Sequence, residues 1–280
     1  DDEHLHDRND CAGRTGRAGD IVTAVLPALA GARDTPAPAA FRAVQVLEYL
    51  SSCTEPATLT EIALALGIAK SSGSNLISTL EAARMVRRAG HGWLLGYKVL
   101  ELGQSLLAST SLVSEFRRIT NALPTLQHDT ALLAALDGME VIYLARHDGT
   151  QPIRLASDIG RRMPASVTAL GKAMLSALDA DDLDARLADL TTLPRPTKRA
   201  HRTVAELRRD LTQIRSRGYA IDDEQNTIGV TCFAVPVLSS GQPVAVSTTL
   251  LTQRVRPELR ERLIADLSSL ARQLSNFAIG

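Results

Sequence analysis

The 280-residue sequence has few aromatic residues and no net charge. Phe, Trp and Tyr make up 3% of it, so the hydrophobic core must consist mainly of Leu, Val, Ile and Ala. Because 31 basic residues balance 31 acidic ones, no overall field attracts a polyanion. If the protein binds nucleic acid, the binding surface must therefore be local.

Cysteine is also scarce, and the usual motifs of enzymes are missing. Cys11, Cys53 and Cys232 are odd in number, widely spaced and in no C-x-x-C pair, which argues against a disulfide framework or a zinc ribbon. No apolar run is long enough to span a membrane. The six histidines lack metal-ligand spacing, and no G-x-S-x-G, phosphate-loop or dinucleotide motif is present. We expect no catalytic residues, no metal, no cofactor, no membrane contact and a cytoplasmic location.

The first 40 residues are predicted to form a flexible extension, since they combine Gly, Asp, Arg and Pro without periodicity. Residues 21–32 are apolar and end in small side chains, as in a secretory signal. However, Asp20 adjoins this segment and Pro27 interrupts it. We therefore expect an extension rather than a cleaved signal.

Residues 41–97 contain the signals of three helices followed by a hairpin. An apolar residue at every third position predicts the first helix, from Phe41 onward. Thr58 and Glu61 form a capping box that starts the second helix, and Gly67 permits a left-handed turn after it. This order is that of a winged helix-turn-helix, which places one helix in the DNA major groove.

The third helix, with Ser71 expected as its N-cap, has an outer face of small polar side chains. Such a face lets a helix approach base edges closely. Alternation after Met85, with turns at Gly90 and Gly92, predicts the wing. The candidate DNA-binding residues are Lys70, Ser71, Ser72, Ser74, Asn75, Ser78, Arg87, Arg88 and His91.

The charge of this region leaves an alternative open. Residues 41–110 contain six basic and five acidic side chains, which is a weak electrostatic footprint for DNA binding. A helix-turn-helix can also contact proteins. The second reading is therefore a metabolite-binding module or degenerate enzyme whose head serves protein contacts.

Residues 98–110 are predicted to form a linker helix, and residues 111–280 mix helices and strands. The mixture predicts an α+β fold with an antiparallel sheet. The expected elements are a helix at 112–126, a hairpin turning at 137–138, a strand at 152–157, a loop at 160–168, helices at 169–178, 179–190 and 203–218, a hairpin turning at 239–241, and a helix at 257–276.

Three blocks resemble the IclR family of bacterial transcriptional regulators, over residues 41–276. They are L-T-E-I-A-L-A-L-G-I-A-K-S-S with the later W-L-L-G, the segment Gly160–Leu175, and the segment Arg217–Val237. The resemblance implies a winged helix-turn-helix domain joined by a linker helix to a GAF-like effector domain. It also implies a homodimer or homotetramer, more often a repressor, that binds a double-stranded operator and a small organic or aromatic acid.

Two residues of the third helix depart from the family pattern. Gly73 and Asn75 stand where relatives usually carry a larger apolar residue and an arginine. Asn75 can still read adenine with two hydrogen bonds, but it loses a positive charge that would attract phosphate. Gly73 weakens the helix by about 1 kcal/mol.

The resemblance places the effector pocket in the second and third blocks and on a later strand. The sequence independently favours a helix start after Thr168, where free N–H groups attract anions, and Ser247 and Thr249 share one face of a strand. Cys232 is alternatively a packing residue, and Asp222 part of a solvated turn. The candidate effector-binding residues are Leu155, Met163, Thr168, Ala169, Leu170, Asp222, Cys232, Ser247 and Thr249.

Overall fold

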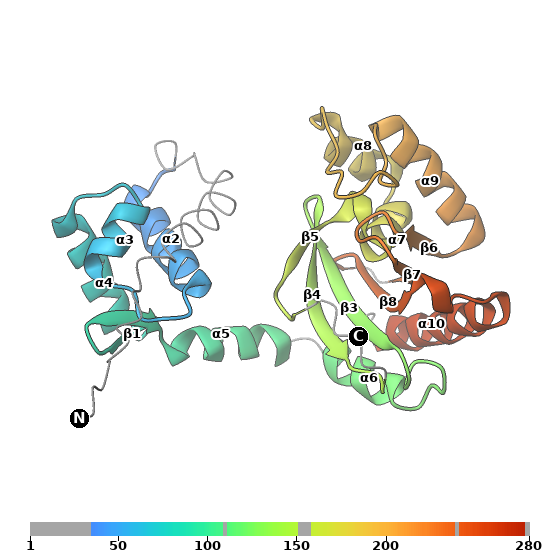
Figure 1. Ribbon diagram of the computed structural model, residues 1–280, viewed down its shortest axis with the longest axis horizontal. Coiled ribbons are helices and arrows are strands. Elements are labelled where there is room, and N and C mark those ends of the chain that lie inside the picture. Colours follow the sequence, from blue (N-terminus) through green and yellow to red (C-terminus); the bar gives the residue numbers. More distant parts are fainter. Residues whose placement is uncertain (1–34, 109–110, 151–157, 239–240, 278–280) are drawn as a thin grey trace, which may run out of the picture. The chain divides into compact units, whose positions relative to one another are not determined.

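The computed structural model describes residues 35–108, 111–150, 158–238 and 241–277 (Figure 1). The chain divides into two compact units, residues 1–106 and 107–280. The expected extension at residues 1–34 and the expected strand at 152–157 lie outside the described residues. No described helix is long and apolar enough to cross a membrane.

The first unit is a three-helix head with a two-stranded wing. Its core contains Val46, Ile62, Ile77 and Leu80, with at most 7% of any of these residues exposed. The elements are α2 (Pro38–Ser52), α3 (Leu59–Ala65), α4 (Lys70–Ala82), β1 (Val86–Ala89), β2 (Gly92–Leu95) and α5 (Tyr97–Ala108).

The capping box of the second helix is confirmed. The main-chain N–H of Thr58 donates to Glu61 Oε2 at 2.7 Å, and the N–H of Glu61 donates to Thr58 Oγ1 at 3.3 Å. Gly67 is left-handed as expected, with φ +63°. Two isolated hydrogen bonds between Ala57 and Trp93 tie the wing to the loop before α3.

Two details of the head differ from the prediction. Ser71 is not the N-cap of α4, because the helix begins at Lys70 after Ala69 and has no side-chain cap. The predicted apolar face of α2 was also wrong in part. This helix starts at Pro38, and it buries Val46 while Val44 stays 52% exposed.

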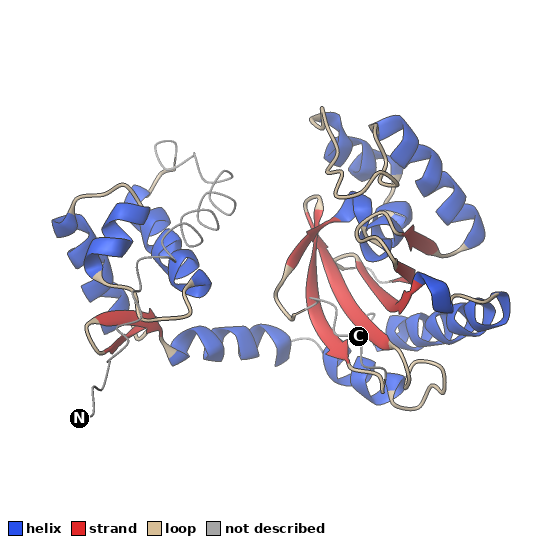
Figure 2. Cartoon of the chain, viewed as in Figure 1, coloured by secondary structure: helices blue, strands red, loops and turns tan. Residues whose placement is uncertain are grey.

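The second unit is an antiparallel six-stranded sheet with helices on both faces (Figure 2). Its strands are β3 (Thr130–Asp137), β4 (Glu140–His147), β5 (Arg162–Pro164), β6 (Ala220–Asp223), β7 (Val230–Val237) and β8 (Val244–Leu251). Its helices are α6 (Ser111–Thr120), η3 (Ala165–Val167), α7 (Ala169–Ala177), α8 (Ala180–Ala188), α9 (Val204–Arg217), η4 (Thr252–Arg254) and α10 (Pro257–Phe277).

Two hairpins meet at the centre of the sheet. The strand order is β5-β4-β3-β8-β7-β6, so β3 of the first hairpin pairs with β8 of the second. In this pairing Thr130 lies opposite Thr249 and Leu132 opposite Ser247. Residues distant in sequence therefore become neighbours on one sheet face.

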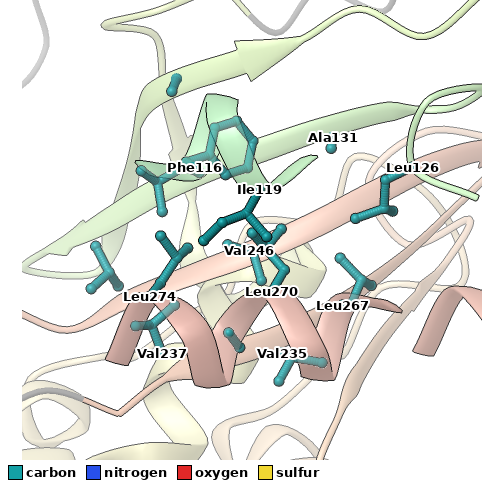
Figure 3. Packing of buried hydrophobic residues seen from close by; sticks show 14 of the residues in the cluster. Phe116, Ile119, Leu126, Ala131, Val235, Val237, Val246, Leu267, Leu270 and Leu274 are labelled. Carbon is teal, nitrogen blue, oxygen red and sulfur yellow. The ribbon is translucent and has the colours of Figure 1, made fainter. Parts of the chain in front are cut away.

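The two faces of the sheet are covered by different helices. α6 and α10 pack on the first face, where Phe116, Ile119 and Leu270 lie among aliphatic strand residues such as Val246 (Figure 3). α7 packs on the second face together with α9. We call these the α6–α10 face and the α7 face.

Most elements of this unit were predicted, with three corrections. The helix expected at 112–126 ends at Thr120, since a proline at position 124 disfavours helical backbone before it. The expected loop 160–168 contains β5 and η3. β6 was missed, because four residues ending in two aspartates have too little alternation to predict a strand.

Candidate DNA-binding face and effector site

The polar face of α4 is exposed. Lys70 and the side chains of Ser71, Ser74, Asn75 and Ser78 are all open to solvent, whereas Ser72 is half-buried. Within the described residues, none of these side chains makes a hydrogen bond or ion pair. The face therefore offers unpaired hydroxyl and amide groups at i, i+3, i+4 and i+7, as base-edge readout requires.

Gly73 faces the other way, into the head. A Cβ built on it would lie 3.3 Å from Leu59 Cδ1 and 3.6 Å from Ala63 Cβ. The glycine therefore allows α4 to pack closely against α3. A larger apolar residue at this position would push the two helices apart.

The wing presents two arginines that stack on aromatic rings. The Arg88 guanidinium lies 4.9 Å from the Trp93 ring centre, and that of Arg87 lies 5.4 Å from the Tyr97 ring centre. Stacking orients a guanidinium without using its N–H donors, which remain available to phosphate oxygens. His91 is exposed at the turn between β1 and β2.

The start of α7 forms one side of the candidate effector site. Thr168 is its N-cap, and the Thr168 hydroxyl accepts the N–H of Gly171 at 3.1 Å. Ala169 and Leu170 follow and are buried. A Cβ on Gly171 would lie 2.3 Å from the backbone of Ala165, so only glycine permits this close packing of α7 on η3.

The opposite side of the site comes from three neighbouring strands. Asp222 lies opposite Cys232, and Cys232 lies opposite Thr249, with Cys232 Sγ 3.4 Å from Thr249 Oγ1. Ser247 is two residues before Thr249 and opposite Ala234, which packs on the α7 face. All four predicted polar residues therefore share that face.

Ser247 is 1% exposed, and its hydroxyl makes no hydrogen bond with any described residue. A buried hydroxyl normally has a partner, because leaving it unpaired costs about 1–3 kcal/mol. A ligand atom at this face would satisfy it.

The carboxyl of Asp222 and the thiol of Cys232 are both desolvated. Asp222 is 2% exposed, and its Oδ1 accepts the N–H of Gln225 at 2.8 Å and that of Asn226 at 3.1 Å. Burial raises the pKa of Asp222 to about 6 despite these bonds. Burial also raises the pKa of Cys232 to about 12, so this thiol stays protonated at neutral pH and is a poor nucleophile.

The remaining predicted positions are less central. Met163 lies on β5 opposite Val141 and packs at the edge of the core on the α7 face. Leu155 lies outside the described residues. In the described part of the chain, no cluster of His, Cys, Asp and Glu side chains is arranged to hold a metal ion.

Sequence reasoning missed a buried ionic network next to the site. Lys172 of α7 donates to Asp210 of α9 at 2.8 Å, and Asp210 also contacts His201 Nε2 at 3.0 Å. The one available signal was a lysine inside the otherwise apolar and small run A-L-G-K-A-M-L.

Comparison with known proteins agrees with this geometry. The family model for the bacterial transcriptional regulator IclR C-terminal domain matches residues 104–276, and that for the IclR helix-turn-helix domain matches residues 39–90. The chain belongs to the IclR family. It is therefore a transcriptional regulator with a helix-turn-helix domain and a ligand-binding C-terminal domain.

Several IclR relatives align over most of the chain. The regulator XynR of Escherichia coli is 32% identical over 220 residues, covering 76% of this chain and 86% of XynR. The transcriptional repressor IclR of Escherichia coli is 29% identical over 197 residues, covering 69% of this chain and 72% of that repressor.

Solved IclR structures share the architecture. An IclR transcriptional regulator from Alicyclobacillus acidocaldarius has a TM-score of 0.73 at 25% identity, covering 86% of this chain and 98% of its own. An IclR homologue from Microbacterium hydrocarbonoxydans, complexed with 4-hydroxybenzoate, has a TM-score of 0.68 at 20% identity. The match covers 84% of this chain and 98% of the homologue. The second likeness concerns the fold alone.

Proposed function

We propose that the chain is a cytoplasmic repressor that binds a palindromic operator as a homodimer or homotetramer and is controlled by a small acid. The exposed face of α4, whose side chains have no partner among the described residues, is the observation that supports DNA binding. Arg87, Arg88, His91 and Lys70 would contact phosphates, while Asn75 and the serines read base edges.

The effector is proposed to be a small carboxylic acid. The start of α7 offers N–H groups to an anion, and Ser247 offers a buried hydroxyl that has no partner among the described residues. Asp222, Cys232 and Thr249 would complete the polar wall, with Met163, Ala169 and Leu170 as apolar lining. The complex of the Microbacterium homologue with 4-hydroxybenzoate makes aromatic acids the first compounds to test.

Pairing of two copies is supported by the exposed apolar side chains of α5. Tyr97 is 72% exposed, Leu100 60% and Leu102 51%. A second copy would cover these side chains and supply the second head that a palindromic site requires.

DNA binding is tested by gel shift and footprinting on the region upstream of the chain's own gene, at about 0.1 M salt. We expect one protected palindrome, and at least about tenfold weaker binding for Asn75→Ala, because a bidentate base contact contributes about 1–3 kcal/mol. Ser52→Ala, at an exposed position of α2, is the matched control and should bind DNA normally. If wild type protects no site, the head serves another partner.

Effector binding is tested by thermal shift with a panel of small acids that includes 4-hydroxybenzoate. Replacing both Ser247 and Thr249 with valine should abolish the shift and the release of DNA, yet leave operator binding intact. Thr248→Val is the matched control on the opposite sheet face, where the Thr248 hydroxyl donates to Thr130 O at 3.2 Å. A retained response in the double variant would refute the site.

A further inference from the structure

Lys172 is a buried cation with every donor committed. It lies one turn after Thr168 on α7, and its side chain is 1% exposed. Its ammonium donates to Asp210 Oδ2 at 2.8 Å, to the carbonyl oxygen of Ile221 at 2.6 Å, and to Gln225 Oε1. An ammonium has three donors, so these contacts saturate it.

Two of the three acceptors lie on either side of Asp222. Ile221 directly precedes it on β6, and the main-chain N–H of Gln225 donates to Asp222 Oδ1 at 2.8 Å. Thr197 also supports the segment that follows β6, since its hydroxyl donates to the carbonyl oxygen of Gln225 at 2.9 Å. The lysine therefore connects the α7 side of the effector site to the backbone that carries Asp222.

We propose that Lys172 is the positioning residue of the effector site, which fixes the place of Asp222 and sets the charge of its carboxyl. The inference rests on the proposed effector site and names how that site is held. Lys172 touches the support of Asp222 rather than the ligand, so its effect is indirect.

The charges around Asp222 leave this carboxyl without an ion partner of its own. Lys172 is already paired with Asp210, which also lies 3.6 Å from Arg217. The groups that interact electrostatically with Asp222 or with the Lys172–Asp210 pair are Lys172 on α7, Asp210 and Arg217 on α9, Asp223 on β6, Cys232 on β7, Tyr143 on β4, and His201 on a loop.

An acidic effector therefore meets a carboxyl that binds a proton more readily than an exposed aspartate does. Burial raises the pKa of Asp222, and the field of Lys172 opposes that rise. A protonated Asp222 can donate its O–H to a ligand carboxylate, whereas an ionised one would repel it. Lys172 thereby sets the pH range in which the acid is accepted.

The network also reaches the surface. A cleft of about 430 Å³ is lined by Lys172, Asp210, His201 and Gln225, together with Arg209 and Arg217. His201 lies 3.0 Å from Asp210, and Gln225 Nε2 lies 3.4 Å from His201 Nε2. The cleft therefore opens the Lys172–Asp210 end of the network to solvent.

The first test follows the titration of Asp222 in the full chain without ligand. Carboxyl-¹³C aspartate labelling gives the titration curves by NMR, and the signal lost in Asp222→Asn assigns the residue. In Lys172→Met we expect the midpoint to rise by about one pH unit, because Asp210 keeps its charge while the cation is gone. Lys198→Met, which removes an exposed lysine, should leave the midpoint unchanged.

The second test measures hydrogen exchange at the N–H groups of Gln225 and Asn226, which donate to Asp222. We expect exchange about tenfold faster in Lys172→Met, because this variant lacks the charged hydrogen bonds that Lys172 donates to Ile221 and Gln225. If that variant does not fold, Gln225→Leu removes a single side-chain acceptor from a half-exposed position. Gln225→Leu should also speed up the exchange of these N–H groups, but by a smaller factor.

Calorimetry with 4-hydroxybenzoate, in two buffers of different ionisation enthalpy, then counts the protons taken up on binding. Failure of wild type to bind this acid would exclude 4-hydroxybenzoate as the effector, while both ligand-free tests would still decide the role of Lys172. The inference would be overturned if the titration midpoint of Asp222 or the exchange rate is unchanged in Lys172→Met. If Lys172→Met does not fold, an unchanged value in Gln225→Leu would overturn it.

Discussion

Both faces of the central sheet are buried, but they carry different polar side chains. The α6–α10 face is built mainly from Leu, Val, Ile, Phe and Ala, and the hydroxyls of its buried Thr231 and Thr248 are hydrogen-bonded. The α7 face combines a similar apolar core with Ser247, Asp222 and Lys172. Because burying polar groups is unfavourable unless they are paired, the Ser247 hydroxyl without a partner among the described residues favours the α7 face as the proposed binding half, with the α6–α10 face as its support.

Leu270→Ala should have the largest effect on stability. Its side chain is fully buried on α10, and such truncations cost about 2–5 kcal/mol because a cavity remains. Urea unfolding at pH 7 measures the loss, with Leu238→Ala, 68% exposed, as control. A loss below about 1 kcal/mol would show that this face repacks freely and is not the rigid support.

Asp222→Asn should stabilise the fold at alkaline pH. The folded pKa of about 6 exceeds the ordinary aspartate pKa of 3.8, so the stability contributed by Asp222 is full below pH 4 and lost as pH rises through 6. Asparagine keeps the acceptor oxygen and removes the charge. We expect a gain of up to about 3 kcal/mol at pH 8 and almost none at pH 4. An equal gain at both values would contradict the linkage.

Asp210→Asn should have the opposite sign. Burial alone would raise the pKa of Asp210, but hydrogen bonds with His201 and Lys172 outweigh it and lower the pKa to about 2. Its contribution is therefore present above pH 4 and lost as pH falls toward 2. Unfolding at pH 7 should show a loss of about 2 kcal/mol, which narrows as the pH approaches 2. No loss at pH 7 would mean that the ion pair merely balances its own desolvation.

Ser247→Ala should have the smallest effect on stability. Its hydroxyl has no partner among the described residues, so alanine removes no hydrogen bond there and should lower the free energy of unfolding by less than about 1 kcal/mol. Ser176→Ala is the contrasting control, since that buried hydroxyl donates to Ala173 O at 2.8 Å. Thermal melts compare the two variants. A Ser247 variant that melts lower than the Ser176 variant would assign Ser247 a structural role.

The sequence predicted elements whose signals are local. The capping pairs Thr58–Glu61 and Thr203–Glu206, the glycine at 218 and the turn at 137–138 each mark a boundary through backbone chemistry alone. β5 and β6 could not be predicted, because strands of three or four residues depend on a partner elsewhere in the chain.

The site was predictable to a similar extent. Ser247 and Thr249 share a face because strands alternate, and the structure places Asp222 and Cys232 beside them. Lys172, His201 and Asp210 form their network only after α7 and α9 pack together, and nothing in their spacing indicates it. Their roles, like those of the other site residues, remain proposals for the tests above.

The pairing of β3 with β8 also orders events during synthesis. Thr130 and Thr249 are neighbours in the sheet, although 118 residues lie between them. The effector unit therefore cannot close until the ribosome has released the chain beyond Leu251, whereas the contacts within the head are all made by residues up to 106. A newly made molecule acquires the part that contacts the operator before the part that can respond to a metabolite.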